Sequence, residues 1–167
     1  MWKYLVIDDF LDKEVYDKLV NNIKDYKLQD NEEIHRKFLT TDPTPQVNWL
    51  FAKKNFPRHR PYSQLKKMIH YAVTKENFTH PLHDEAPFKI MSAIIYLHPE
   101  KNVGTILRHK EKEIEVEWKP NRLMVFCGLE DITWHYYKTT EARYTYNYFL
   151  VNPAEMENKE LKKHIID

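Results

Sequence analysis

The spacing of apolar positions predicts a strand and two helices in the first part of the chain. The apolar run over residues 2 to 7 predicts the strand. Asp12 is a residue type that begins helices, and the apolar residues that follow it at helical spacing are Val15, Leu19 and Ile23. A second helix is predicted from Ser63, with its apolar side formed by Leu65, Met68, Ile69 and Ala72.

The stretch between these helices, residues 28 to 61, lacks a sustained period and contains Pro43, Pro45, Pro57 and Pro61. Proline interrupts both helices and strand ladders, so we expect a long surface loop. Such loops serve as lids or binding loops, or are ordinary irregular connections. This stretch also carries two basic runs, Lys53-Lys54 and Arg58-His59-Arg60.

After residue 88 the pattern becomes typical of strands. The predicted strands cover residues 89–98, 113–118, 122–127 and 143–151, and a charged helix is predicted over residues 154–166. Helices followed by a succession of short strands predict an α+β fold, in which an antiparallel barrel or double-sheet roll packs against the helices. A small barrel of this kind offers an interior pocket.

Composition excludes several classes of protein. The chain has 167 residues, the size of one domain, and its net charge of +1 gives no general attraction to nucleic acid or membrane. Only two glycines occur, which argues against a glycine-rich phosphate loop. The single cysteine, Cys127, lies in an apolar run and is predicted to be a buried thiol. The N-terminal apolar run is too short for a signal peptide or a membrane span, so we expect a soluble cytoplasmic protein.

Two histidines and one glutamate are the candidate metal ligands. In extended backbone His83 and Glu85 point to the same face, whereas Asp84 points away. His135 supplies a second imidazole from the connection between two predicted strands. Two imidazoles and one carboxylate suit non-haem Fe(II) and leave three coordination positions open. His80, three residues before His83, is a competing ligand, but residues three apart in a strand face opposite sides, so it is not expected to bind the metal.

Arg143 is the candidate anion ligand. It follows His135 by eight residues and begins a predicted strand in which Arg143, Thr145 and Asn147 share a face. A guanidinium binds a carboxylate through two parallel hydrogen bonds, which suits the distal carboxylate of 2-oxoglutarate. Because burying an unpaired arginine is costly, an inward Arg143 implies an anionic partner. The alternative is a surface arginine paired with a glutamate.

The candidate residues stand within a longer series of motifs. In chain order these are Leu5-Val6-Ile7-Asp8-Asp9, His83-Asp84-Glu85, Ile95-Tyr96-Leu97, Val103-Gly104, Asn121-Arg122-Leu123, Thr133-Trp134-His135 and Arg143-Tyr144-Thr145. In order and spacing this series resembles the 2-oxoglutarate/Fe(II) oxygenases, and among them the prolyl-4-hydroxylase-like group. The resemblance covers nearly the whole chain except residues 28 to 61 and the predicted C-terminal helix.

The resemblance implies a double-stranded β-helix, which is a jelly-roll, cupin-like barrel with supporting N-terminal helices, formed by residues 1–167 as one oxygenase domain. It implies Fe(II) held by His83, Glu85 and His135, with O₂ as the oxidant. It also implies 2-oxoglutarate as co-substrate, bound by the residues Arg143, Thr145 and Tyr96. For Tyr96 a core aromatic residue is the alternative.

The sequence departs from the family pattern at two places. The usual aspartate ligand is replaced by Glu85, and the usual paired glycines are reduced to Val103-Gly104. The implied reaction is hydroxylation of a protein or peptide side chain with release of succinate and CO₂, and the alternative substrate is a small molecule. Nucleic acid is not expected, because Phe149 stands where alkylation-repair demethylases carry a second arginine. A different class is a non-catalytic jelly-roll binding module, for which Glu85 is the main evidence.

Overall fold

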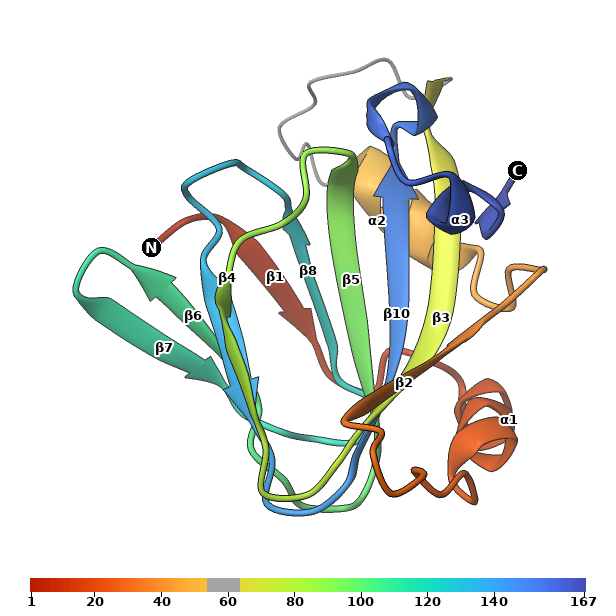
Figure 1. The fold of residues 1–167 in the computed structure, drawn as a ribbon, viewed down its shortest axis with the longest axis vertical. Coiled ribbons are helices and arrows are strands. Elements are labelled where there is room, and N and C mark those ends of the chain that lie inside the picture. The colour runs from red at the N-terminus through yellow and green to blue at the C-terminus, as the bar shows by residue number, and fades with distance from the viewer. Residues whose placement is uncertain (54–63) are drawn as a thin grey trace.

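Two antiparallel β-sheets face each other in the computed structural model, which describes residues 1–53 and 64–167 (Figure 1). The large sheet contains, in spatial order, β1 (Tyr4–Ile7), β8 (Leu123–Cys127), β5 (Lys89–His98), β10 (Arg143–Val151), β3 (Lys66–Thr74) and β11 (Ile165–Ile166), and β2 (Ile34–Phe38) also pairs with β3. The small sheet contains β4 (Thr79–His83), β9 (His135–Lys138), β6 (Thr105–His109) and β7 (Lys112–Val116).

The chain passes back and forth between the two sheets. It runs from β3 in the large sheet to β4 in the small one, returns to β5, crosses to β6 and β7, returns to β8, crosses to β9 and ends the roll in β10. This winding brings strands that are distant in sequence side by side and is the connectivity of a jelly roll. The predicted double-stranded β-helix is therefore confirmed.

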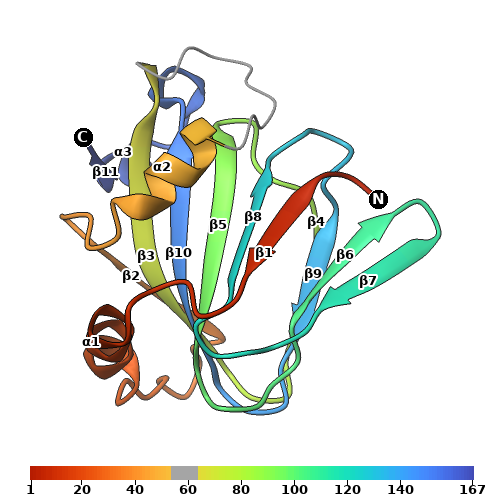
Figure 2. The same cartoon turned by 180° about the vertical axis from the view of Figure 1, so that it is seen from behind.

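Two N-terminal helices, α1 (Lys13–Ile23) and α2 (Gln46–Lys53), lie on the outer face of the large sheet (Figure 2). Leu19 of α1 and Val47 of α2 belong to the same hydrophobic cluster as Tyr71 and Tyr146 of the central strands. Asp12 stands at the N-cap position of α1, so the first predicted helix is confirmed. Within the two described ranges, no helix has the length and apolar content that crossing a membrane requires.

The side chains of strand β10 alternate between the two faces of the large sheet. Its side chains that point toward the helices are in the main hydrophobic cluster and are Tyr144, Tyr146, Tyr148 and Leu150. Its side chains that point toward the small sheet line a cavity and are Arg143, Thr145, Asn147 and Phe149. Because side chains alternate along a strand, one segment builds both the core and the wall of the cavity.

The helix predicted from Ser63 is wrong where the structure describes it. Residues 66–74 form β3, which pairs with β10 on one side and with β2 and β11 on the other. Every residue from Met68 to Thr74 is buried. A strand buried on both faces reads as a continuous apolar run, which spacing alone cannot distinguish from one side of a helix. Ser63 itself lies outside the described residues.

The loop predicted over residues 28–61 is wrong where β2 and α2 form. Pro43 and Pro45 lie in the link between these two elements, where proline interrupts neither a ladder nor a helix. The side chains of both predicted basic runs, and residues 54–61 as a whole, lie outside what the structure describes.

The long C-terminal helix is also wrong. The segment instead forms a 3-10 turn at Pro153–Glu155, a short helix α3 (Lys159–Lys162) and the strand β11. The side chain of Asn158 accepts hydrogen bonds from the amides of Glu160 and Leu161 and so begins α3 separately. Ile165 then pairs with Met68, which ends the helix by adding a strand to the sheet edge.

Candidate functional site

A cavity of about 100 Å³ lies between the sheets and is lined by strands of both. Five predicted site residues line it: His83, Glu85, His135, Arg143 and Thr145. The fold thus brings the candidate metal ligands and the candidate anion ligand, which are up to 60 residues apart in sequence, to one place.

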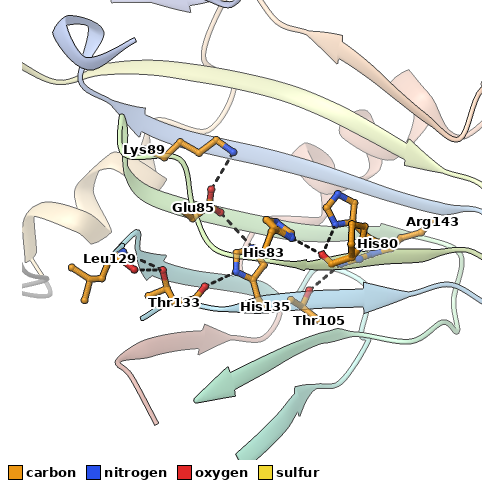
Figure 3. Close-up of polar contacts among 10 residues, drawn as sticks. His80, His83, Glu85, Lys89, Thr105, Leu129, Thr133, His135 and Arg143 are labelled. Carbon is orange, nitrogen blue, oxygen red and sulfur yellow. Dashed lines mark hydrogen bonds and ion pairs between the residues drawn. The ribbon is translucent and has the colours of Figure 1, made fainter. Parts of the chain in front are cut away.

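The two candidate imidazole ligands lie beside each other on paired strands. His83 of β4 is the direct partner of His135 of β9, and their ring centres are 4.3 Å apart. The Nδ1 atoms lie 2.8 Å from the carbonyl oxygens of Pro81 and Thr133, respectively (Figure 3). A carbonyl oxygen only accepts, so both Nδ1 atoms donate, and in the neutral form of each ring the lone pair that a metal binds is on Nε2.

Glu85 is buried and lies between a histidine and a lysine. Its Oε1 is 3.6 Å from His135 Nε2, and its Oε2 is 3.1 Å from Lys89 Nζ (Figure 3). Burial alone would raise the pKa of Glu85, but the positive charge of Lys89 and its hydrogen bond to the carboxylate outweigh burial and hold the pKa at about 2. The carboxylate is therefore ionised throughout the physiological range.

The donors fit a divalent metal in kind, since two neutral imidazoles and one carboxylate are the set that non-haem Fe(II) prefers. Within residues 1–53 and 64–167, however, no group of three His, Cys, Asp or Glu side chains is arranged to hold an ion as it stands. Glu85 shares its charge with Lys89 instead. Binding of a metal therefore requires the three donors to close further around one point.

The structure corrects the expected direction of His80. Along β4, His80 pairs with Tyr137 and His83 with His135, so three residue steps on β4 oppose two on β9. This bulge inserts one residue and returns His80 to the side of His83, where their ring centres are 4.5 Å apart. His80 lines the cavity, and its burial lowers its pKa to about 4. Alternation of side chains, on which the prediction rested, does not hold across a bulge.

Arg143 is the most unusual polar residue of the cavity. Its side chain is buried, and Nη2 donates to Oγ1 of Thr105 at 3.0 Å. The other two guanidinium nitrogens, Nε and Nη1, are buried without a hydrogen-bond partner among the described residues. Burial lowers the pKa of Arg143 from its ordinary value, which records the cost of keeping this cation out of water. Two unused donors at this cost indicate a site prepared for an anion.

Tyr96 lies in the core rather than on the cavity wall. Its ring stacks on Trp118 at 4.5 Å, and its hydroxyl lies 2.9 Å from Thr105 Oγ1 and 3.1 Å from the carbonyl oxygen of Val116. This position agrees with the alternative prediction, in which Tyr96 is a core aromatic residue. Direct contact of Tyr96 with the co-substrate stays a prediction. In the structure Tyr96 contacts Thr105, which in turn accepts the hydrogen bond from Arg143.

Thr105, Lys89 and Tyr137 line the cavity but were not identified from the sequence. The sequence signal for Thr105 is its position directly after Gly104, one of the motif residues. Thr145 was identified, and its Oγ1 accepts a hydrogen bond from Asn147 Nδ2 at 3.1 Å, on the shared face that alternation predicted.

The amino-acid sequence matches no protein-family model and no curated protein. The fold does match solved structures. A prolyl hydroxylase from Trichoplax adhaerens, in complex with a peptide fragment of the hypoxia-inducible factor oxygen degradation domain, superposes with a TM-score of 0.67 at 13% identity, over 91% of this chain and 84% of that chain. A prolyl-4-hydroxylase from Pseudomonas putida gives a TM-score of 0.67 at 12% identity, over 89% and 92% of the two chains.

A third similar structure is the viral collagen prolyl hydroxylase of Paramecium bursaria Chlorella virus-1 in its 2-oxoglutarate complex. It gives a TM-score of 0.65 at 12% identity and covers 88% of this chain and 94% of that chain. Identities this low establish shared architecture and no more. The chain therefore has the double-stranded β-helix fold of the prolyl-4-hydroxylases and related 2-oxoglutarate/Fe(II) oxygenases.

Proposed function

We propose that the protein is an Fe(II)- and 2-oxoglutarate-dependent dioxygenase that hydroxylates a side chain of a protein or peptide. One observation carries the proposal: Arg143 lines the same cavity as His83, Glu85 and His135, and its buried guanidinium has two donors without hydrogen-bond partners among the described residues. A dicarboxylate that also binds a metal satisfies both ends of this cavity at once.

In this proposal His83 and His135 each offer Nε2 to the metal, because their Nδ1 atoms are held by carbonyl oxygens. Glu85 supplies the charged oxygen. Arg143 binds the distal carboxylate of 2-oxoglutarate through Nε and Nη1, while Thr105 holds Nη2 and fixes the plane of the guanidinium. Bound Fe(II) supplies the redox chemistry by which 2-oxoglutarate, O₂ and a substrate C–H give succinate, CO₂ and a substrate C–OH.

The assignment of a protein or peptide substrate is the finer part of the proposal. It is supported by the likeness in fold to prolyl hydroxylases, of which the Trichoplax adhaerens enzyme holds a peptide. Ile34 and Arg36 of the strand β2 line the cavity, and Arg36 is an exposed cation. A substrate that approaches over β2 would therefore meet a positive charge first.

The test of the central proposal has two stages. Fe(II) and then 2-oxoglutarate are titrated into the protein without oxygen, and succinate is measured after oxygen is admitted. We expect 2-oxoglutarate to bind, succinate to form slowly without substrate, and both to be lost in Arg143→Met. Folded protein that binds neither metal nor 2-oxoglutarate and forms no succinate would overturn the proposal.

The substrate class needs a separate experiment. Enzyme loaded with Fe(II) and 2-oxoglutarate is added to a lysate, and peptides and metabolites are searched by mass spectrometry for a gain of one oxygen. Oxygen gained by peptides and absent with Arg143→Met supports the peptide assignment. Gain confined to metabolites would replace it with the small-molecule alternative.

A non-catalytic jelly-roll binding module is the second candidate, and the ion pair between Glu85 and Lys89 favours it. The pair neutralises the carboxylate that would otherwise attract a metal. Such a module would bind 2-oxoglutarate or another anion at Arg143 with the same affinity with and without Fe(II), and would form no succinate.

A further inference from the structure

The glutamate at position 85 raises a geometric problem if it is to serve as a metal ligand. Its side chain has one methylene more than the aspartate it replaces and therefore one more rotatable bond. A ligand must be held within about 0.5 Å of its productive position, so the additional freedom has to be removed by contacts with its surroundings. The contacts of its two carboxylate oxygens show how this is achieved.

Each oxygen of Glu85 has a different neighbour. Oε1 lies 3.6 Å from His135 Nε2, the nitrogen whose lone pair is available, and Oε2 lies 3.1 Å from Lys89 Nζ. Both side chains are largely withdrawn from solvent, with 5% of Glu85 and 23% of Lys89 exposed. An ion pair with this burial has a defined geometry, unlike the exposed pairs on the surface.

Lys89 is itself fixed. Its Nζ lies 4.2 Å from the centre of the Phe149 ring, on the inward face of β10, and this cation–π contact orients the ammonium toward the cavity. Lys89 is also the first residue of β5, four residues after Glu85, and its backbone pairs with Val151 of β10. Lys89 is therefore positioned both by the pairing of its backbone and by the contact of its ammonium group with Phe149.

Gly128 brings the backbone of this segment into place. A Cβ added to Gly128 would lie 2.4 Å from the carbonyl oxygen of Lys89 and 3.0 Å from Cβ of Glu85. The segment that carries Glu85 and Lys89 thus packs directly against a residue without a side chain. This close approach places Cβ of Glu85 next to Gly128, the residue that follows β8.

We propose that Lys89 is a positioning residue for the metal site: its ammonium holds Oε2 of Glu85, so that Oε1 alone is offered beside His135. Lys89 thereby allows a glutamate to serve where the related oxygenases usually carry an aspartate. This inference rests on the proposed function, and it assigns the hydrogen-bonded partner that ligating carboxylates need.

The test measures metal affinity without turnover. Mn(II) or Co(II) is titrated anaerobically into the wild type, Lys89→Met and Lys89→Arg, and the Co(II) absorption spectrum reports the coordination geometry. Loss of a hydrogen-bonded partner behind a ligand typically weakens metal binding by about 10- to 100-fold. We expect this loss and an altered spectrum in Lys89→Met, with recovery in Lys89→Arg, which keeps the charge.

Lys67→Met is the matched control. Lys67 pairs with Asp42 at 3.1 Å, with 20% and 9% of the two side chains exposed, so its ion pair has the same length and similar burial but lies outside the cavity. We expect this variant to lose thermal stability as Lys89→Met does while keeping wild-type metal affinity. A weakened metal site in Lys67→Met as well would attribute the effect to general destabilisation and overturn the inference.

A double-mutant cycle with Glu85→Asp provides the second readout. The shorter side chain removes Oε2 from the reach of Lys89, so the losses in metal affinity should not add when both residues are changed. Additive losses would show that Lys89 acts independently of Glu85, and tighter metal binding in Lys89→Met would show that Lys89 competes with the metal. Either result would overturn the inference alone. A wild type that binds no metal would instead overturn the proposed function, and this inference with it.

Discussion

The guanidinium carbon of Arg143 lies 3.8 Å from the centre of the Tyr137 ring. Arg143 belongs to β10 of the large sheet and Tyr137 to β9 of the small sheet, so this contact spans the cavity. The Tyr137 hydroxyl also lies 3.0 Å from Oγ1 of Thr74 in β3. The proposed anion site is therefore built jointly by both sheets, and its geometry depends on how they are stacked.

Replacement of Tyr137 by leucine should weaken the binding of 2-oxoglutarate. The aromatic face stabilises and orients the buried cation, and a cation–π contact contributes about 0.5–2 kcal/mol, which corresponds to a loss of about 2- to 30-fold. Calorimetry with Mn(II) in place of Fe(II) measures this directly. Tyr137→Phe is the control, because it keeps the ring and removes only the contact with Thr74. Wild-type affinity in folded Tyr137→Leu would contradict the assigned role.

Replacement of Arg143 by methionine should abolish 2-oxoglutarate binding without lowering the stability of the ligand-free protein. The buried Nε and Nη1 atoms have no hydrogen-bond partner in residues 1–53 and 64–167, and each such donor costs roughly 1–3 kcal/mol that a methionine does not incur. Thermal unfolding with and without 2-oxoglutarate tests both parts. We expect an equal or higher melting temperature without ligand and no upward shift with it. A marked loss of ligand-free stability would show that Arg143 is a structural residue.

The stability of the protein should fall in acid partly because of His70. Burial, aided by the positive charges of Arg36 and Lys89, lowers the pKa of His70 to about 3 in the folded state. In the unfolded state its pKa is about 6.5, so the unfolded chain binds the extra proton between these two values. His70 therefore does not reduce the free energy of unfolding above about pH 6.5. Below that value the free energy of unfolding falls as the pH decreases toward 3.

His70→Gln removes this titration. The variant should therefore lose less free energy of unfolding in acid than the wild type, by a few kcal/mol at most. Denaturant unfolding at a series of pH values gives the free energies of both proteins. The comparison is between slopes, because other buried histidines titrate in both. Identical slopes between pH 6.5 and 4 would show that His70 does not carry the depressed pKa.

Replacement of Gly104 by alanine should damage the fold and the anion site together. The added Cβ would lie 1.8 Å from the carbonyl oxygen of Val116, which also accepts from the Tyr96 hydroxyl. Relief of this clash must separate β6 from β7 and disturb Thr105, so we expect a loss of about 3 kcal/mol or more and weaker 2-oxoglutarate binding. Val103→Ala, at the adjacent position, is the control. A Gly104→Ala protein as stable as the control would contradict the packing described.

Sequence patterns located the strand that carries the candidate anion ligands and the strand that begins at Lys89. The bounds of β5 and β10 match those predicted, because both are long and rich in β-branched and aromatic residues. Alternation then placed Arg143 and Thr145 on one face without knowledge of the partner strands. The strands β4, β6 and β9 were missed because each has only four or five residues and a mixed composition.

The remaining differences come from interactions that are remote in sequence. The direction of His80 depends on a bulge whose position is set by pairing with β9, not by the residues around it. The partner of Glu85 could be found only once Phe149 and Gly128 had placed Lys89. Similarly, the strand identity of β3 is fixed by neighbours on both sides.

The two-faced character of β10 limits how this protein can acquire a new specificity. A shift of the strand by one residue would carry its tyrosines into the cavity and its arginine beneath the helices, so we expect an insertion or deletion there to disrupt both the fold and the site. Among the described residues, the strand β2 pairs only with β3 and does not build both the core and the cavity wall as β10 does. Its residues Ile34 and Arg36 nevertheless line the same cavity. Variation that retunes substrate choice, whether natural or in a laboratory library, is therefore best tolerated along β2.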